Sequence, residues 1–471
     1  MFPGKPVFLL TDILVFGLVL CIVMFFLYAM RKPHLRQPWQ QVVRSRAGVI
    51  SMIVLSVYVG IALLDSVHFH PVLENQSAAS GQVQHSGEVI SLFDRMVSGL
   101  RESGEKTYSA PFAAYLYAKE TVQQDDGTKQ RVYPRLAWGA SHLEHPETQK
   151  TGDVLRLGLT GALKAVVLWG ALVLLLGWVL SLRAGRAFRV TLGILFSGRS
   201  RIPWRTVVVT LGIVLLVLMT GAEWATKYHV LGTDKVGEDV LYQALKSIRT
   251  GVVIGTLTTL LMLPFAVLFG IMAGYFRGWV DDVIQYLYTT LNSIPGVLLI
   301  AAAVLMLNVY MSKHAEQFAS LTQRADLRLL FLCLILGLTS WTGLCRLLRA
   351  ETLKLREVDF IQAATAFGVG RVQTIFRHIL PNVMHIVLIT LVLDFSGLVL
   401  AEAVLSYINI GVDPTMNSWG NMINSARLEM AREPVVWWSL AASLFFMFTL
   451  VLFANLFADV VRDALDPRLS R

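Results

Sequence analysis

The chain has 471 residues, of which 55% are hydrophobic and 15% are charged, and its formal net charge is +9. A soluble globular domain carries roughly 25% charged residues, so this composition excludes an ordinary soluble protein. The mean hydropathy of +0.59 and several long apolar windows indicate a polytopic, all-α membrane protein. The basic residues lie in short loops beside apolar segments, so we expect them to orient helices and not to bind nucleic acid.

The hydropathy pattern predicts nine membrane-spanning helices, at residues 7–30, 47–65, 158–182, 206–224, 251–276, 283–308, 328–346, 383–408 and 437–458. The first is not read as a signal peptide, because its apolar run is long and no small-residue cleavage site follows it. Pro264 and Pro295 are predicted to interrupt the fifth and sixth helices, either along a transport pathway or as simple packing kinks.

Two loops, 31–46 and 183–205, contain basic residues and no acidic residue. The positive-inside rule predicts that both are cytoplasmic, which places the amino terminus and region 66–157 outside. The same alternation places segment 351–381 and the carboxyl terminus in the cytoplasm. Region 66–157 has nearly balanced charges and is expected to form a small domain or a structured loop, with a flexible start at 74–87 and a turn at 125–127.

Ionisable residues inside predicted spans are candidates for function. Asp394 and Glu402 are eight residues apart in the eighth helix, so they share roughly one face. They could serve a proton-coupled carrier, or neighbouring helices or water could satisfy them. Asp12 is expected to lie at the membrane interface, and Lys164 is expected to extend to the outer surface.

Other kinds of site receive little support from the sequence. His142 and His145 are three residues apart in region 66–157, but Gly139 and Pro146 flank them and make a helix doubtful. Solvated loop histidines are therefore favoured over a metal site, and a metal-binding sensor built on 66–157 stays a less favoured alternative. The chain contains no GxxxxGK[ST] phosphate-binding loop, so any ATP must be bound by a partner chain.

Segment 351–381 is a charged stretch between two predicted spans and is longer than a simple turn requires. It predicts an amphipathic helix at 356–367, a break at Gly368 and Gly370, and a second short helix at 371–379 that Pro381 ends. Apolar residues recur at helical spacing in both helices: Phe360, Ile361, Ala364 and Phe367 in the first, and Val372, Ile375, Phe376 and Ile379 in the second. These features suit docking to another protein and, almost equally, attachment to a lipid surface.

Several motifs from about residue 231 onward resemble those of the binding-protein-dependent ABC importer permeases, in the subgroup that serves dipeptides, oligopeptides and nickel. The matching stretches are 231–240 (LGTDKVGEDV), 274–281 (GYFRGWVD), Gln362-Ala363-Ala364 with Gly368 and Leu380-Pro381, 400–406 (LAEAVLS), 418–422 (SWGNM) and 462–468 (RDALDPR). Two departures stand out: Glu238 replaces the usual Arg, and Gln362 replaces the usual Glu.

The resemblance implies a type I ABC importer permease core of about 240 residues, 231–471, in a bacterial inner membrane, with no catalytic, cofactor or metal site in this chain. ATP and magnesium would bind to two cytosolic ATPase subunits. A homologous second permease and a periplasmic solute-binding protein would complete the importer, whose solute is a peptide or, alternatively, nickel. Segment 351–381 would be the coupling loop, with these residues at the ATPase: Phe360, Gln362, Ala363, Ala364, Gly368, Arg371, Leu380 and Pro381.

The resemblance also suggests a division of the chain. Residues 1–46 would form an additional helix and a basic loop, and 47–65 would be the first core helix. Region 66–157 would then be a periplasmic insert, followed at 158–224 by two further helices. Alternatively, 206–224 is the first core helix. Pro295, Asp394 and Glu402 are the candidates for the pathway.

Overall fold

The computed structural model describes residues 4–72, 85–123, 129–198, 200–314 and 320–465. The predicted turn at 125–127, most of the predicted flexible stretch 74–87 and the end of the 462–468 motif lie outside these residues. The contacts divide the chain into two compact units. The first comprises Met1–Val7, Gln40–Thr250 and Asn417–Leu456, and the second comprises Phe8–Trp39, Gly251–Met416 and Phe457–Arg471.

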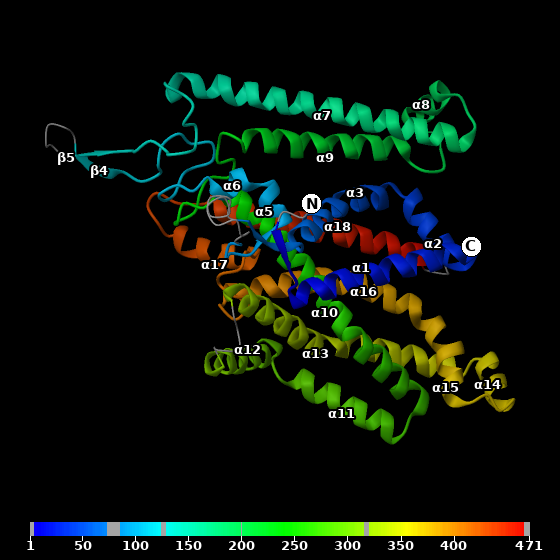
Figure 1. Ribbon diagram of the computed structural model, residues 1–471. Helices are drawn as coiled ribbons and strands as arrows, with labels where there is room; N and C mark the ends of the chain where they lie inside the picture. Colours follow the sequence, from blue (N-terminus) through cyan, green and yellow to red (C-terminus); the bar gives the residue numbers. More distant parts are fainter. Residues whose placement is uncertain (1–3, 73–84, 124–128, 199, 315–319, 466–471) are drawn as a thin grey trace. The chain divides into compact units, whose positions relative to one another are not determined.

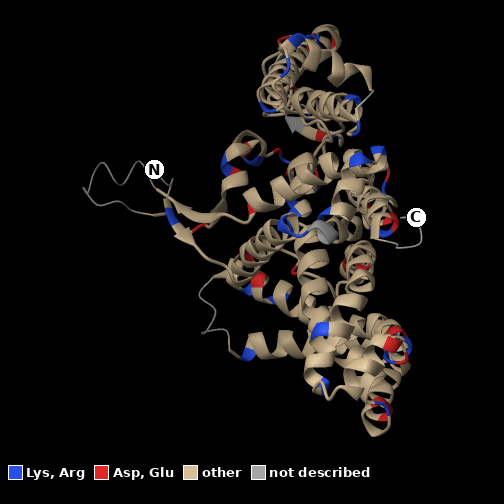
Figure 2. Cartoon of the chain, turned by 90° about the vertical axis from the view of Figure 1, so that its right-hand side faces the viewer, with Lys and Arg blue, Asp and Glu red and all other residues tan. Residues whose placement is uncertain are grey.

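Nine helical stretches in the described residues are long and apolar enough to cross a membrane, which confirms the predicted number. They are α1 (Leu10–Arg31), α3 (Arg46–Asp65), α7 (Pro146–Ala184), α9 (Trp204–Trp224), α10 (Val240–Phe276), α12 (Gly296–Lys313), α13 (Leu321–Arg356), the continuous stretch Arg371–Tyr407 and α18 (Trp438–Leu465) (Figure 1). Charged residues are sparse along these helices, as a hydrocarbon environment requires (Figure 2).

The prolines act differently from the sequence prediction at two of three positions. Pro264 lies inside the unbroken helix α10, so the predicted interruption there is wrong. Pro295 does break the predicted sixth helix, into α11 (Trp279–Ser293) and α12, because the residue before a proline favours extended backbone. Pro381 does not end the short helix before it, because it lies in the first turn of α16 (Leu380–Tyr407), where its missing N–H is tolerated.

The structure shows the surroundings of two ionisable residues in the predicted spans, Asp12 and Lys164. Asp12, in the first turn of α1, is only 2% exposed, so protein buries its side chain, and its expected place at the membrane interface stays a prediction. The neighbouring Thr11 backbone N–H donates to Asp326 of α13, 3.2 Å away, so this end of α1 packs within the second unit. Lys164 pairs with Glu223 of α9 at 2.6 Å.

In the first unit, α7 and α9 form a long antiparallel hairpin closed by α8 (Phe188–Ser197) (Figure 1). Small residues bring the two helices close: a Cβ on Gly161 would lie 2.7 Å from the Thr220 Cα. The indole N–H of Trp169 donates to the carbonyl of Val208 at 2.8 Å. Helix α2 (Pro33–Arg44) precedes α3.

Region 66–157 is built from small elements that belong to the first unit. Strand β2 (His68–Pro71) pairs antiparallel with β1 (Gly4–Val7) on one side and with β3 (Ile90–Ser91) on the other. The short helices α5 (Leu92–Met96) and α6 (Ser98–Glu102) follow, and then a hairpin of β4 (Glu120–Gln123) and β5 (Lys129–Val132). The β1–β2 pairing means that the amino-terminal segment and region 66–157 lie at the same end of the spanning helices.

The second unit contains α11, α12, α13, α16 and the connecting helices α14 (Asp359–Ala366) and α15 (Arg371–Thr374). A hydrophobic core joins α13 and α16 to the later part of α10; Met262, Trp341 and Val387 are among its buried members. Gly270 and Gly274 allow α10 to approach α13, because a Cβ at either position would meet α13 at 2.6–2.8 Å. This core supports the charged segment 351–381.

Candidate functional site

Segment 351–381 is a short helix–turn–helix between α13 and α16. Helix α13 continues to Arg356, and α14 begins at Asp359 and ends at Ala366. Gly368 has a φ of +79°, a left-handed conformation that glycine adopts without strain. The N–H of Val369 donates to the carbonyl of Ala364 at 3.1 Å, so the turn satisfies a carbonyl at the end of the helix.

Three buried residues anchor this segment. Ile361 is 1% exposed, and Thr374 and Ile379 are fully buried. Ile361 and Ile379 pack in the same hydrophobic core as Trp341 of α13 and Tyr275 of α10. A π-helical turn, Ile375–Ile379, leads directly into α16, so the segment is joined to that helix without a flexible linker.

The opposite side of the segment exposes large apolar residues: Phe360 at 45%, Phe367 at 86%, Val372 at 65% and Phe376 at 65%. The sequence pattern grouped Phe360, Ile361 and Phe367 on one helix face. The structure separates them, since Ile361 points into the core while the two phenylalanines are exposed. Of the other predicted residues, Gln362, Ala363, Gly368, Arg371 and Pro381 are exposed, and Ala364 and Leu380 are half-buried.

Polar contacts tie the segment to the turn between α10 and α11. Glu357 pairs with Arg277 of this turn at 2.6 Å. The side-chain amide of Gln362 donates to the backbone carbonyl of Glu357 at 3.2 Å. A glutamate at 362 would have no N–H to donate and would lie beside the Glu357 carboxylate, 3.5 Å from the present amide. Gln362 therefore suits the local charge pattern of this chain.

Asp394 lines a cavity of about 470 Å³ between α13 and α16, within the second unit. Apolar residues and small polar ones such as Ser340 and Thr390 form most of its wall. Glu402, by contrast, is 1% exposed and accepts a hydrogen bond from Ser406 at 2.7 Å. The structure therefore places Asp394 in a cavity and Glu402 in packed protein, and Pro295 does not line that cavity.

A charged cluster around His229, in the loop between α9 and α10, was not predicted from the sequence. The fully buried imidazole lies between two carboxylates, with Nδ1 2.7 Å from Asp239 and Nε2 3.5 Å from Glu105. Glu105 also accepts backbone N–H groups, at 2.8 Å from Trp138 and 3.0 Å from Gly139. Part of the sequence signal was present, because His229 lies two residues before the 231–240 motif and Asp239 belongs to that motif.

The cluster shifts the acidity of its members. Burial alone would lower the pKa of His229, but the carboxylates of Asp239 and Glu105 outweigh it and raise the pKa to about 9. Burial alone would raise the pKa of Glu105, but the imidazole and the backbone N–H donors lower it to about 2. The imidazole of His229 and the carboxylate of Glu105 are therefore both charged at neutral pH, and the cluster links region 66–157 to the loop before α10.

Two glycines of the 231–240 motif have a structural explanation. Gly237 has a φ of +84°, and a Cβ there would lie 1.8 Å from the backbone oxygen of Glu105. Gly232 has a φ of +72°, and a Cβ would lie 2.4 Å from the oxygen of Ser109. The motif thus requires glycine where the 105–109 stretch of region 66–157 passes closest.

The histidines of region 66–157 do not form a metal centre within the described residues, where no group of three or more candidate ligands converges. His142 instead lies 2.8 Å from Asp153. The alternative of a metal-binding sensor gains no support from this geometry.

Comparison with known proteins gives one family. Residues 266–471 match the family described as binding-protein-dependent transport system inner membrane component. The oligopeptide transport system permease protein of Mycobacterium bovis is 30% identical over 239 residues, covering 51% of this chain and 76% of that protein. The corresponding protein of Haemophilus influenzae is 29% identical over 251 residues, covering 53% and 74%.

A third relative is matched over nearly its whole length. The glutathione transport system permease protein of Pectobacterium atrosepticum is 28% identical over 315 residues, covering 60% of this chain and 98% of that protein. These matches agree with the motifs from residue 231 onward. The chain belongs to the family of binding-protein-dependent transport system inner membrane components.

Proposed function

We propose that this permease subunit carries peptides and that segment 351–381 couples it to a cytosolic ATPase. Membership of the family makes the chain a multi-pass inner membrane component of an ABC importer, a class that works with a solute-binding protein and ATPase subunits. Peptides are the proposed solute because the relatives include oligopeptide and dipeptide permeases. Nickel remains the alternative solute.

One observation carries the coupling proposal. Segment 351–381 is anchored by Ile361 and Ile379 in the core, yet it exposes Phe367 and Phe376 on its outer side. Apolar side chains held on a firmly attached support are suited to a groove on a partner protein. A lipid-bound helix would not need so firm an attachment to two spanning helices.

The proposed mechanism converts closure of the ATPases into movement of helices. ATP and magnesium bind to two partner ATPase subunits, and their closure displaces the docked segment. Because Arg371–Tyr407 is one continuous helical stretch and α13 leads directly into the segment, both helices follow that displacement. The cavity that Asp394 lines lies between these two helices, so their movement changes the side of the membrane from which the cavity can be reached.

Asp394 is the leading candidate for a residue along the solute pathway. Its half-buried carboxylate could attract a protonated amine such as a peptide amino terminus. Pro295, at the break between α11 and α12, stays a second candidate. Glu402 fits a structural role better, because Ser406 donates to its carboxylate within the packed interior.

The proposed topology places the amino terminus and the insert 66–157 in the periplasm, and segment 351–381 and the carboxyl terminus in the cytoplasm. Contacts within the second unit support loops that alternate between the two sides of the membrane. Arg277 pairs with Glu357 at one end of the helices, and Arg328 pairs with Asp413 at the other. The basic loops 31–46 and 183–205, which contain no acidic residue, support the assignment of their side of the membrane to the cytoplasm. We retain 47–65 as the proposed first core helix and 158–224 as an addition, with 206–224 as the alternative.

Uptake in cells tests the solute. A strain lacking this chain would be supplied with labelled dipeptides, longer peptides or nickel ions, with and without the chain restored. Peptide uptake that returns only with the chain supports the proposal. If restoring the chain brings back nickel uptake but not peptide uptake, the solute is nickel and the peptide proposal is wrong.

A further inference from the structure

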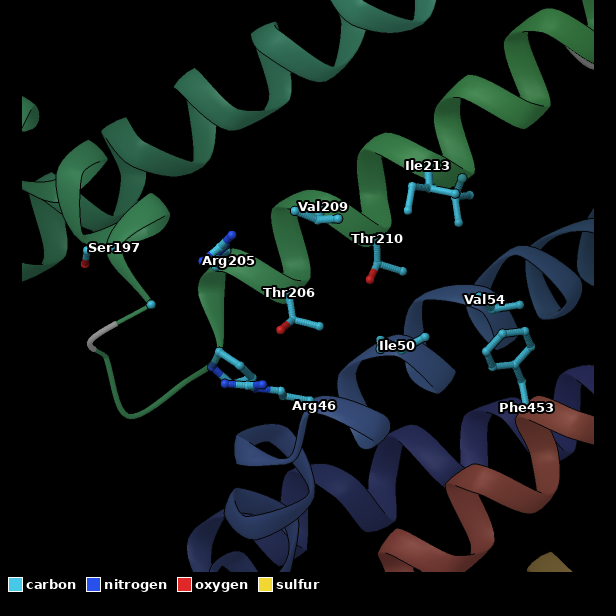
Figure 3. A pocket seen from close by; sticks show the side chains of 13 residues that line it. Arg46, Ile50, Val54, Ser197, Arg205, Thr206, Val209, Thr210, Ile213 and Phe453 are labelled. Atoms are coloured by element: carbon cyan, nitrogen blue, oxygen red, sulfur yellow. The ribbon is translucent and has the colours of Figure 1, made fainter.

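A cavity of about 820 Å³ lies in the first unit, at the end where helices α3 and α9 begin. Its walls come from α3, the end of α8 and the loop after it, α9 and α18, and all of the lining residues belong to this unit. Figure 3 shows Arg46 extending from the start of α3 toward the start of α9. The volume lies within the roughly 300–1,000 Å³ typical of ligand sites.

The end of the cavity near the helix starts is cationic. Arg46 is the first residue of α3, and Arg205 lies in the first turn of α9. Both line the cavity, both are exposed, and neither pairs with a carboxylate within the described part of the chain. The loops that precede them, 31–46 and 183–205, contain no acidic residue that could neutralise them. An anion therefore finds two uncompensated guanidinium groups there.

The rest of the cavity is mainly apolar. Ile50 and Val54 of α3 face α9, and Phe453 of α18 closes the wall (Figure 3). The lining of α3 runs from Arg46 to Val54, and the eight steps between these residues rise about 12 Å along the helix axis. Thr206 and Thr210 of α9 face α3, and neither hydroxyl has a hydrogen-bond partner among the residues described.

We propose that this cavity binds one anionic glycerophospholipid. Its phosphate lies between Arg46 and Arg205, its glycerol esters accept hydrogen bonds from Thr206 and Thr210, and an acyl chain follows the apolar wall. A lipid matches the arrangement because the cavity lies between spanning helices and changes from cationic to apolar along them. A free phosphate would use only the cationic end. This site is independent of the peptide and coupling proposals.

Binding to the purified full-length chain tests the proposal. Delipidated protein in mild detergent would be titrated with phosphatidylglycerol, phosphatidylcholine or inorganic phosphate, and bound molecules would be counted by native mass spectrometry. Phosphatidylglycerol should bind more tightly than phosphatidylcholine. The double variant R46Q/R205Q should lose about fivefold in phosphatidylglycerol affinity for each arginine removed.

Matched variants separate the possible causes. R46K/R205K keeps the charge and should retain preference for phosphatidylglycerol. R183Q/R186Q removes two exposed basic residues at the end of α7 and just after it that do not line the cavity, and this variant should bind phosphatidylglycerol as the wild type does. Val54→Trp fills the apolar part of the cavity, so it should weaken the binding of phosphatidylglycerol and leave the binding of inorganic phosphate unchanged.

Three results would overturn the proposal. One is equal affinity for phosphatidylglycerol and phosphatidylcholine in the wild type. Another is unchanged phosphatidylglycerol affinity in a folded R46Q/R205Q protein, or an equal loss in R183Q/R186Q. The last is phosphate binding as tight as lipid binding together with no effect of Val54→Trp, which would show a site for a free anion. None of these results bears on peptide uptake or on ATPase docking.

Discussion

His229 joins two stretches of the first unit that are far apart in the sequence. Its imidazole lies between Glu105 of region 66–157 and Asp239 at the start of α10. Buried carboxylates are costly unless a positive charge pairs with them, and His229 supplies that charge only while its imidazole is protonated. The arrangement therefore makes the attachment of region 66–157 sensitive to pH.

The sign of this dependence follows from the shifts. The pKa of His229 is raised from 6.5 to about 9, so its stabilisation is complete below pH 6.5 and is lost as pH rises through 9. The pKa of Glu105 is lowered from 4.5 to about 2, so its stabilisation is present above pH 4.5 and is lost as pH falls through 2. His229 and Glu105 are both charged in the pH range between these two windows.

His229→Gln should therefore remove the alkaline part of this dependence. Thermal unfolding of the detergent-solubilised chain would be followed from pH 6 to pH 10. The wild type should lose up to about 3 kcal/mol between pH 6.5 and 9, while the variant is less stable at pH 6 and nearly flat across that range. His142→Gln is the control and should behave as the wild type does. The same alkaline slope in His229→Gln and the wild type would contradict the assignment.

Gly237→Ala tests the contact beside that cluster. The added Cβ would lie 1.8 Å from the Glu105 oxygen, and the φ of +84° strains any L residue. We expect a loss of about 1–3 kcal/mol in unfolding free energy, together with faster hydrogen exchange at residues 103–109. Gly104→Ala should change little, because its added methyl group would have no neighbour within 4 Å and Gly104 has no positive φ. Equal effects of the two substitutions would refute the close approach.

At the scale of elements, segment 351–381 combines a buried anchor with an exposed face. The sequence predicted two short helices and the break at Gly368, because glycine and helical spacing are local signals. It could not predict which side Ile361 would occupy, because that depends on the core formed by α10, α13 and α16. Continuity through Pro381 also depends on a π-helical turn that no sequence signal marks.

The two faces predict different consequences for neighbouring residues. Ile361→Ala should leave a void in the core and speed hydrogen exchange across 359–379, at a cost of about 2–4 kcal/mol. Phe360→Ala removes a 45% exposed side chain and should leave this exchange unchanged. Exchange mass spectrometry of the full chain compares them directly. If Phe360→Ala speeds exchange as much as Ile361→Ala does, the division into anchor and face is wrong.

At the scale of the whole molecule, hydropathy predicted the number of spans well because each must satisfy its own backbone within lipid. Their ends were predicted less well: α7 begins at Pro146, well before the expected 158, and α10 begins at Val240. These extra turns lie outside the apolar windows and are stabilised by packing. The role of His229 was not predicted because it also depends on tertiary packing, since its partner Glu105 is distant in the sequence.

Topology can be tested by labelling single cysteines in intact cells with a membrane-impermeant maleimide. Tyr133→Cys, on the exposed part of region 66–157, should react from outside. Phe367→Cys should react only after the membrane is permeabilised. The unmodified chain serves as background, since Cys333 and Cys345 are buried and Cys21 lies within a spanning helix. Labelling in the opposite order would reverse the proposed orientation.

The central claim is that segment 351–381 docks on an ATPase subunit. Its most direct test is purification of the importer through a tag on this chain, with measurement of the ATPase subunits that accompany it. Phe367→Ser should leave the amount of this chain in the membrane unchanged and reduce the ATPase subunits recovered, while Tyr133→Ser, also an exposed aromatic residue, should not. Full recovery of active ATPase with Phe367→Ser, and with Gly368→Trp beside it, would contradict the docking claim.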